Sequence, residues 1–264
     1  MYSVIIPSIG RVKYLNDLIQ SIFEQTILPK EIIILLDDNK KCKDDSRFIF
    51  QKDKCKINFC NNLNLPQKRN YGALIAKTKY LIFSDDDDIW DRKKGELTIQ
   101  SLSINQVLCH EYSKFGYSDQ RPKFLMGKKR KLIKIKDLLM GSNIFGGGSG
   151  IACIREVVLA IPFNKEFDFC EDFDWWIKVI LAEIKVEYYP INLVKYRVHK
   201  ENMTSNFLRI YKFNTKILKK LLYISLVLFF AFLNGYLKSS INFLIKFLKY
   251  LLFKFIDKSR RYTQ

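Results

Sequence analysis

Apolar runs and helical periodicity alternate along the first third of the chain. Continuous apolar runs at residues 2–7, 31–36 and 79–84 have the length and β-branched composition of buried strands. Residues 14–25 place apolar side chains at helical spacing, and residues 66–77 are also expected to be helical. Strands that are apolar throughout and alternate with helices are typical of a parallel sheet covered on both faces. The pattern therefore predicts a Rossmann-like, mostly parallel α/β fold.

The rest of the chain divides into a less regular middle part and a helical end. In the middle part we expect a basic run with a strand and turn at 128–141, a glycine-rich loop at 146–150, strands at 151–154, 186–190 and 193–199, and a helix at 169–183. From about residue 206 the chain changes to long helices without glycine-rich loops. The sequence therefore predicts a domain over 1–205 and a helical region over 206–264.

Polar side chains follow three of the predicted strands. The strands end in Pro7 and Ser8, in Asp37 and Asp38, and in the run Asp85–Asp88. In open α/β sheets the carboxyl ends of parallel strands meet at one edge, and ligands bind there. These residues are therefore expected to lie together in a binding site.

The four consecutive aspartates need a counter-charge. A solvated acidic turn is one interpretation, but carboxylates this close raise one another's pKa unless a cation lies among them. Mg²⁺ and Mn²⁺ prefer oxygen ligands and keep positions for water and substrate phosphates. A divalent ion that bridges Asp85 or Asp87 to a diphosphate would also stabilise a departing nucleotide diphosphate as a Lewis acid. The run therefore favours a metal–diphosphate site.

The order of these motifs resembles that of family 2 glycosyltransferases. The resemblance covers roughly residues 2–200 and rests on SVIIPSIGR, LPKEIIILLDDN, QKRNYGALIAKTKYLIFSDDDDIW, GGGSG and FCEDFDWWIKV. It implies the GT-A fold and inverting transfer of a sugar from a nucleotide diphosphate. It also implies that Asp85, Asp86 and Asp87 form a DxD-type site, with Mn²⁺ or Mg²⁺ held mainly by Asp87.

The resemblance also assigns the donor site. It implies that Asp37 or Asp38 accepts a hydrogen bond from the uracil imide, although an ordinary turn is the alternative for this pair. Arg69 resembles the donor-site arginine, and a guanidinium suits a diphosphate; a surface arginine is the alternative. Where the family often has Thr-Tyr-Asn, this chain has Ser8–Gly10. An aliphatic contact is then expected to replace aromatic stacking on the base, with uridine still the favoured nucleoside.

A second carboxylate pair opens the helix predicted at 169–183. Acidic residues are common at a helix N-terminus, so a structural role for Glu171 and Asp172 is one interpretation. By resemblance, Asp172 is the catalytic base that deprotonates the acceptor hydroxyl. A helix N-terminus is expected to keep that carboxylate ionised.

Further residues are assigned to the acceptor and the metal. The resemblance places Gly147 and Gly148 at the acceptor, because glycine lets backbone N–H groups approach a sugar closely. Of Trp175 and Trp176, one is expected in the core and the other could stack on an acceptor sugar. His199 stands where some family members have a further metal or diphosphate ligand, and a structural role is the alternative.

The charge is concentrated at the C-terminal end. The net charge is +18, and residues 212–264 carry eleven Lys or Arg and one acidic residue. Residues 221–237 lack charge, but as a helix of about 25 Å they fall short of a hydrocarbon core of about 30 Å. Residues 238–256 form a basic amphipathic pattern that favours an anionic membrane interface. A helical pair packed on the domain or on a dimer partner is the alternative.

The cellular location follows from the two ends of the chain. The chain opens without a basic start or cleavage site, and its six cysteines include no CxxC pair, which favours a reducing cytosol and argues against zinc. We therefore expect peripheral or monotopic attachment to the cytoplasmic face of a membrane. That location suits a lipid-linked or glycan acceptor.

Two other functions remain open at this point. A nucleotidyltransferase on a similar sheet is the first, although SIGRVK has one glycine where a phosphate loop is expected. The second is a module without catalytic activity that binds nucleic acid or scaffolds a membrane complex. Its basic residues lie among apolar helical residues, however, and the predicted cleft is acidic, so nucleic acid is not the expected partner.

Overall fold

The computed structural model describes residues 1–37, 55–117, 129–139, 147–167, 169–199, 202 and 215. The chain divides into two units, Met1–Lys200 and Glu201–Gln264, and every helix and strand below belongs to the first. Asp38 and the helices expected over 221–256 lie outside the described residues, so the C-terminal region stays a prediction. Within the described ranges, no helix combines the length and apolar character needed to cross a membrane.

The first half of the sheet is parallel, as the sequence predicts. Strands β1 (Tyr2–Ser8), β2 (Glu31–Asp37), β3 (Cys55–Cys60) and β4 (Tyr80–Phe83) lie in the order β3-β2-β1-β4 and pair in parallel. The helix α1 (Val12–Phe23) connects β1 to β2, and the helix α3 (Leu65–Ile75) connects β3 to β4. The strand β3 lies outside the apolar runs from which the parallel sheet was predicted. Its middle residues are partly exposed, as expected of a strand at the edge of the sheet.

Helices cover both faces of this half of the sheet. All seven residues of β1 are buried, which explains their continuous apolar character. Val4 and Ile6 belong to the apolar core that includes Leu15 and Leu18 of α1. The opposite face packs against α3, where a Cβ on Gly72 would lie 2.4 Å from the Ile5 side chain. The absence of a side chain at Gly72 therefore lets α3 approach the sheet closely.

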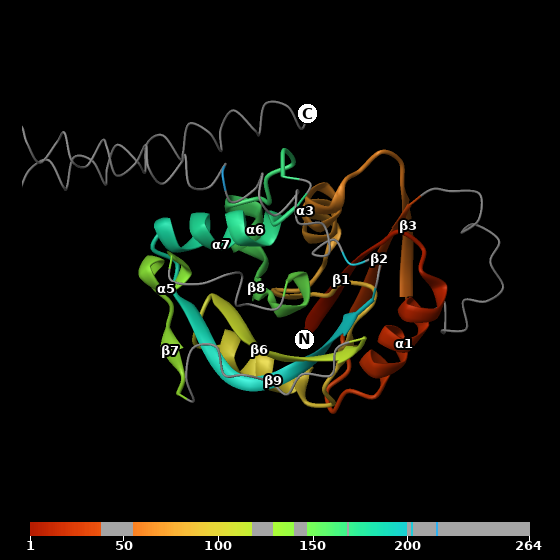
Figure 1. Cartoon of the computed structure of the whole chain (residues 1–264), viewed down its shortest axis with the longest axis horizontal. Coiled ribbons are helices and arrows are strands. Elements are labelled where there is room, and N and C mark those ends of the chain that lie inside the picture. The colour runs from red at the N-terminus through yellow and green to blue at the C-terminus, as the bar shows by residue number, and fades with distance from the viewer. Residues whose placement is uncertain are drawn as a thin grey trace, which may run out of the picture. The chain divides into compact units, whose positions relative to one another are not determined.

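The second half of the sheet is mixed. The remaining elements are β5 (Ile89–Trp90), α4 (Lys94–Leu102), β6 (Val107–Gly116), β7 (Lys131–Leu132), α5 (Ile135–Leu139), the 3₁₀ turn η2 (Gly148–Gly150), β8 (Ala152–Ile154), α6 (Arg155–Ala160), α7 (Glu171–Leu181) and β9 (Val186–Val198). The sheet continues β4-β8-β6-β9-β5, with β7 also on β9. Figure 1 shows β6 beside the long strand β9. Pairing is parallel only between β6 and β9 and antiparallel at β4–β8, β8–β6, β5–β9 and β7–β9.

The prediction of a mostly parallel sheet is therefore wrong for this half. The continuous apolar runs that indicate parallel strands occur only in the first 84 residues, whereas β9 is half-buried. The two strands expected at 186–190 and 193–199 form the single strand β9. Pro190 is tolerated inside it because the register with β6 shifts there, from His110 opposite Tyr189 to Glu111 opposite Asn192. The five cysteines in the described ranges are free thiols.

Candidate active site

The aspartate run lies at the carboxyl end of β4 and is largely buried. Asp86, Asp87 and Asp88 are at most 5% exposed, and the Asp85 side chain is 26% exposed. Asp85 pairs with Arg69, Asp86 with Arg11, and Asp87 with both His199 and Arg11. Asp88 accepts a hydrogen bond of 3.0 Å from the backbone N–H of Arg197. Side chains of the protein itself therefore supply cations to the first three carboxylates.

The strand ends meet as predicted. The Ser8 hydroxyl, at the end of β1, donates to Oδ2 of Asp86 at the end of β4. The ammonium of Lys68 donates to the Ser8 carbonyl oxygen at 2.9 Å and lies 2.5 Å from Oδ1 of Asp37. Lys68 is buried, whereas the Asp37 side chain is 38% exposed. Pro7 is a buried residue of β1. Of these groups, the Asp37 carboxylate is the one that faces solvent.

Asp87 and His199 form a carboxylate–imidazole pair. Oδ2 of Asp87 lies 2.9 Å from Nε2 of His199, and the imidazole ring lies 5.2 Å from the Tyr14 ring. Burial raises the pKa of Asp87, and the charges of Asp85 and Asp86 add to this effect, while Arg11 opposes it. A separation of 2.9 Å also matches two neighbouring ligands of an octahedral ion with metal–ligand distances of about 2.1 Å. The pair therefore fits two positions of a Mn²⁺ or Mg²⁺ site.

The described residues do not contain a complete protein cage for a metal. No group of three or more His, Cys, Asp or Glu side chains in the described ranges is arranged to hold an ion. Asp85 turns instead to Arg69, and Gly148 donates to its Oδ2 from the backbone N–H at 3.2 Å. A divalent ion on Asp87 and His199 would therefore take its other ligands from water and substrate, as Mg²⁺ commonly does.

Arg69 links the aspartate run to the second carboxylate pair. Its Nη2 lies 2.8 Å from Oδ1 of Asp85, and its Nη1 contacts Oε1 of Glu171. The Arg69 side chain is only 1% exposed, so it does not face the solvent where a donor diphosphate would bind. The assignment of Arg69 to the donor site stays a prediction, since the structure shows its guanidinium paired with Asp85 and Glu171. The guanidinium neutralises the buried carboxylate of Glu171 and the partly exposed carboxylate of Asp85.

The glycine-rich loop packs on this buried ion pair. Gly147 has φ +64° and ψ −153°, a conformation essentially restricted to glycine. A Cβ on Gly148 would lie 2.0 Å from Nη2 of Arg69 and 2.5 Å from Oδ1 of Asp85. The Ser149 hydroxyl accepts from the Asp85 backbone N–H at 2.9 Å. In this structure the glycines are needed for contact with Arg69 and Asp85, which differs from the expected reason, approach to a sugar.

The start of α7 lies at the same site. The helix begins at Glu171, and both Glu171 and Asp172 are at most 5% exposed. Burial raises the pKa of Glu171 to about 7, against the attraction of Arg69. Asp172 accepts from the Phe173 backbone N–H at 2.8 Å. The contact between Glu171 and Arg69 brings this pair to the aspartate run, as expected, and the role of Asp172 as a base stays a prediction.

The comparison with protein families identifies the chain. The model of glycosyl transferase family 2 matches residues 3–159, which include β1, α3 and the aspartate run. The chain belongs to glycosyltransferase family 2.

Relatives and solved structures agree with this membership. An uncharacterized glycosyltransferase of Methanocaldococcus jannaschii is 28% identical over 193 residues, which are 70% of this chain and 66% of that protein. The Escherichia coli enzyme named UDP-Glc:alpha-D-GlcNAc-diphosphoundecaprenol beta-1,3-glucosyltransferase WfgD is 24% identical, over 78% of this chain and 80% of its own. The crystal structure of S. aureus TarS 1-349 in complex with UDP has a TM-score of 0.59 at 19% identity, and covers 77% of this chain. The match spans 62% of that TarS chain. The TM-score shows that the two chains share the GT-A fold over the matched part.

Both tryptophans of this family 2 glycosyltransferase lie in the core. Trp175 and Trp176 are fully buried, and Nε1 of Trp175 donates to the Ile161 carbonyl oxygen at 2.8 Å. The Trp175 ring stacks on Phe163 at 5.1 Å. The expectation of one core tryptophan agrees with this burial, while stacking of the other ring on an acceptor sugar stays a prediction that the buried positions do not support.

Four basic residues of the glycosyltransferase site were not predicted from the sequence: Arg11, Lys68, Lys94 and Arg197. The fully buried ammonium of Lys94 donates to the Ser149 carbonyl oxygen at 2.7 Å and lies 4.3 Å from the centre of the Trp90 ring. Arg197 donates from Nε to the Asp87 carbonyl oxygen at 2.8 Å. A signal existed for Arg11, because it follows the end of β1 by three residues. Lys68 directly precedes Arg69 in the motif QKRNYGALIAK, so a signal existed for it too, whereas Lys94 of α4 and Arg197 of β9 lie in no recognised motif.

Proposed function

We propose that this family 2 enzyme is an inverting, metal-dependent glycosyltransferase that uses a UDP-sugar. The observation that carries the proposal is the contact of Arg69 with both Asp85 and Glu171, which joins the DxD-type motif to the carboxylate pair at the start of α7. A donor-binding motif and a carboxylate at the same sheet edge are what a direct displacement requires. UDP also appears in the names of WfgD and of the TarS complex.

The proposed roles follow from the position of each residue. Asp37 is exposed beside the end of β1 and is available to accept from the uracil imide N–H. Asp87 and His199, with Asp85 nearby, would hold Mn²⁺ or Mg²⁺, which supplies Lewis-acid stabilisation of the diphosphate when bound. Asp172 accepts the proton of the acceptor hydroxyl as that oxygen attacks the anomeric carbon. The displacement inverts the anomeric configuration because attack occurs opposite the leaving diphosphate.

The acceptor is proposed to be a glycan or a lipid-linked saccharide, and the sugar a hexose or an N-acetylhexosamine. The name of WfgD includes a diphosphoundecaprenol-linked acceptor, and the chain matches 80% of that enzyme. The basic amphipathic pattern at 238–256 supports attachment to the cytoplasmic face of a membrane, where such an acceptor would be found.

Calorimetry and product analysis test the proposal. UDP is titrated into the full chain with Mn²⁺ and again with EDTA, and UDP-sugars are then supplied with a lipid-linked saccharide. Binding that EDTA abolishes, together with release of UDP and formation of an elongated saccharide, is the expected result. Release of pyrophosphate would indicate a nucleotidyltransferase instead, and absence of binding to UDP, GDP and dTDP would contradict both enzymatic functions.

A further inference from the structure

One guanidinium group, that of Arg11, contacts Asp86, Asp87 and His199 at the proposed metal position. Nη1 of Arg11 lies 2.8 Å from Oδ2 of Asp87 and 3.0 Å from Nε2 of His199. The same group donates from Nε to Oδ1 of Asp86 at 3.1 Å, and its Nη2 contacts that oxygen as well. Nη1 therefore lies against both atoms that would bind a divalent ion.

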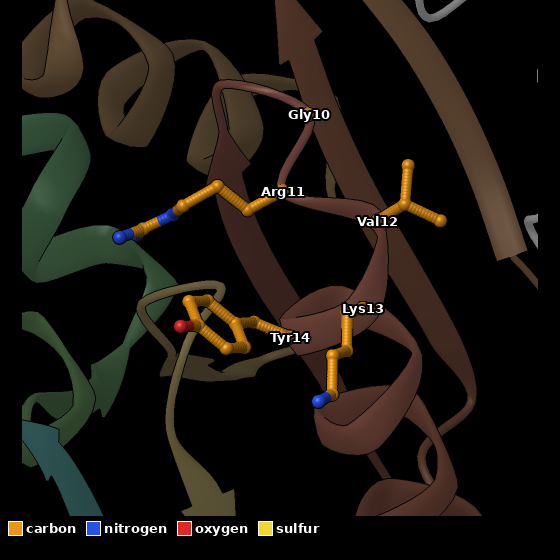
Figure 2. Close-up of a pocket in the computed structure, with 5 residues that line it drawn as sticks. All are labelled: Gly10, Arg11, Val12, Lys13 and Tyr14. Atoms are coloured by element: carbon orange, nitrogen blue, oxygen red, sulfur yellow. The ribbon is translucent and has the colours of Figure 1, made fainter. Parts of the chain in front are cut away.

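Arg11 is partly exposed at this position, unlike Arg69. The Arg11 side chain is 21% exposed, whereas Arg69 is 1% exposed and enclosed between two carboxylates. Gly10–Tyr14 line an open cavity of about 340 Å³ at the turn between β1 and α1. Figure 2 shows Arg11 and Tyr14 extending to the same side of this turn, while Val12 and Lys13 point elsewhere. Arg11 therefore borders open space, and it lies three residues beyond the end of β1.

A guanidinium and a divalent ion cannot share these ligands. The guanidinium carries one positive charge and the ion two, and at a separation of about 3 Å these charges repel strongly in a partly buried site. An ion that binds Oδ2 of Asp87 and Nε2 of His199 must therefore displace Nη1 of Arg11. The displaced guanidinium then needs a new anionic partner, and a diphosphate accepts two parallel hydrogen bonds from an arginine.

We propose that Arg11 is a tethered counter-cation that occupies the metal position in the free enzyme and yields it to the divalent ion when a nucleoside diphosphate binds. This role rests on the proposed function, because it requires a diphosphate at the sheet edge. In the absence of nucleotide the Arg11 guanidinium competes with the ion for Asp87 and His199. When a diphosphate binds the guanidinium, this competition ends. Ion and nucleotide therefore bind cooperatively, and by linkage each strengthens the other equally.

Electron paramagnetic resonance of free Mn²⁺ tests this role without measuring transfer. Mn²⁺ is titrated into the full chain with and without UDP, for wild type, Arg11→Met, Arg11→Gln and the matched control Lys13→Met. Lys13 lines the same turn and is exposed. We expect the two Arg11 variants to bind Mn²⁺ without UDP about tenfold more tightly than wild type, in the usual range of coupling between sites. UDP should strengthen Mn²⁺ binding in all four proteins, because its diphosphate is itself a ligand, but by a larger factor in wild type and Lys13→Met than in the Arg11 variants.

The result is interpretable even if one variant is damaged. Arg11→Gln keeps a hydrogen-bond donor for Asp86, and circular dichroism with thermal unfolding confirms which variants are folded. Folded Arg11 variants that bind Mn²⁺ no more tightly than wild type would overturn the proposal, as would absence of Mn²⁺ binding in every protein. Product analysis tests the proposed function separately. If the Arg11 variants transfer sugar but bind Mn²⁺ with the affinity of wild type, the role of Arg11 is contradicted and the proposed function stands.

Discussion

Nη2 of Arg69 lies 2.8 Å from Oδ1 of Asp85, and Gly148, 63 residues after Asp85, donates to the other carboxylate oxygen of this aspartate. The other end of the same guanidinium contacts Glu171 at the start of α7. A fully buried arginine between two carboxylates keeps its charge, and its pKa is raised above the ordinary value by Glu171 and Asp85 despite burial. The geometry of the site therefore depends on this one ion-pair network.

Replacement of Arg69 is expected to destabilise the fold. Arg69→Met leaves Asp85 and Glu171 without their cation, and removal of one partner of a buried ion pair typically costs about 3–5 kcal/mol of unfolding free energy. Urea unfolding measures this loss, and Arg92→Met, at an exposed position, should change stability by less than about 0.5 kcal/mol. Adding Glu171→Gln should recover part of the loss. Equal stability of Arg69→Met and wild type would show that the network contributes nothing.

Addition of a methyl group at Gly148 is expected to disturb the same network. The new Cβ in Gly148→Ala would lie 2.0 Å from Nη2 of Arg69, so the guanidinium or the loop must move. We expect a loss of about 1–3 kcal/mol in stability, as for other overpacked sites, together with a large loss of transfer activity. Thermal unfolding and product formation measure the two effects. Lys185→Ala, on the surface, serves as the control, and full activity of Gly148→Ala would refute the close packing described above.

The buried ammonium of Lys94 should give stability a specific pH dependence. Burial lowers the pKa of Lys94 from 10.5 to about 7, so between these values the unfolded chain binds one more proton than the folded chain. The contribution of Lys94 to stability is therefore present above pH 10.5 and is lost as the pH falls through about 7. Each unit of pKa difference corresponds to about 1.4 kcal/mol.

Comparison with a variant isolates this effect. Unfolding free energy is measured from pH 7 to 9.5 for wild type, Lys94→Met and the exposed neighbour variant Lys93→Met. Stability should rise with pH more steeply in wild type and Lys93→Met than in Lys94→Met. Parallel curves for all three proteins would mean that Lys94 titrates alike in the folded and unfolded chains.

Asp172→Asn should separate donor binding from turnover. The amide keeps the size of the carboxylate but cannot accept the acceptor proton, so we expect a fall of about 100-fold or more in kcat, the usual contribution of a positioned base. UDP binding measured by calorimetry should stay within about twofold of wild type. Asp91→Asn, at an exposed carboxylate, controls for loss of charge. Loss of UDP binding in Asp172→Asn would contradict the assignment as a base.

The C-terminal lysines should determine affinity for anionic membranes. Lys246→Glu with Lys249→Glu reverses two charges of the predicted amphipathic helix, and each basic residue near such a surface contributes about 1 kcal/mol. Co-sedimentation of the full chain with vesicles containing phosphatidylserine should therefore fall by well over tenfold, with no change for neutral vesicles. Lys93→Glu with Lys185→Glu, at exposed positions outside this region, is the matched control. Unchanged sedimentation of the first variant would favour packing on the domain or on a second copy.

The strands that carry the site were predictable from local patterns. The runs at 2–7, 31–36 and 79–84 form β1, β2 and β4, because continuous burial in a parallel sheet requires apolar side chains at every position. The mixed half was not predictable in this way. Its longest strand, β9, is half-buried and continues through Pro190, which the pattern indicated as a break.

The sequence by itself determined which carboxylates would gather at the sheet edge, since the ends of parallel strands meet there. It did not determine what neutralises them. Arg11 reaches Asp86 across 75 residues and His199 across 188, and Arg69 reaches Glu171 across 102. Such pairs depend on how helices and loops pack on the sheet, and no local propensity encodes them. The tertiary structure therefore decided that Arg11 and Arg69, held by distant elements, balance the aspartates in the protein itself, with His199 placed beside Asp87.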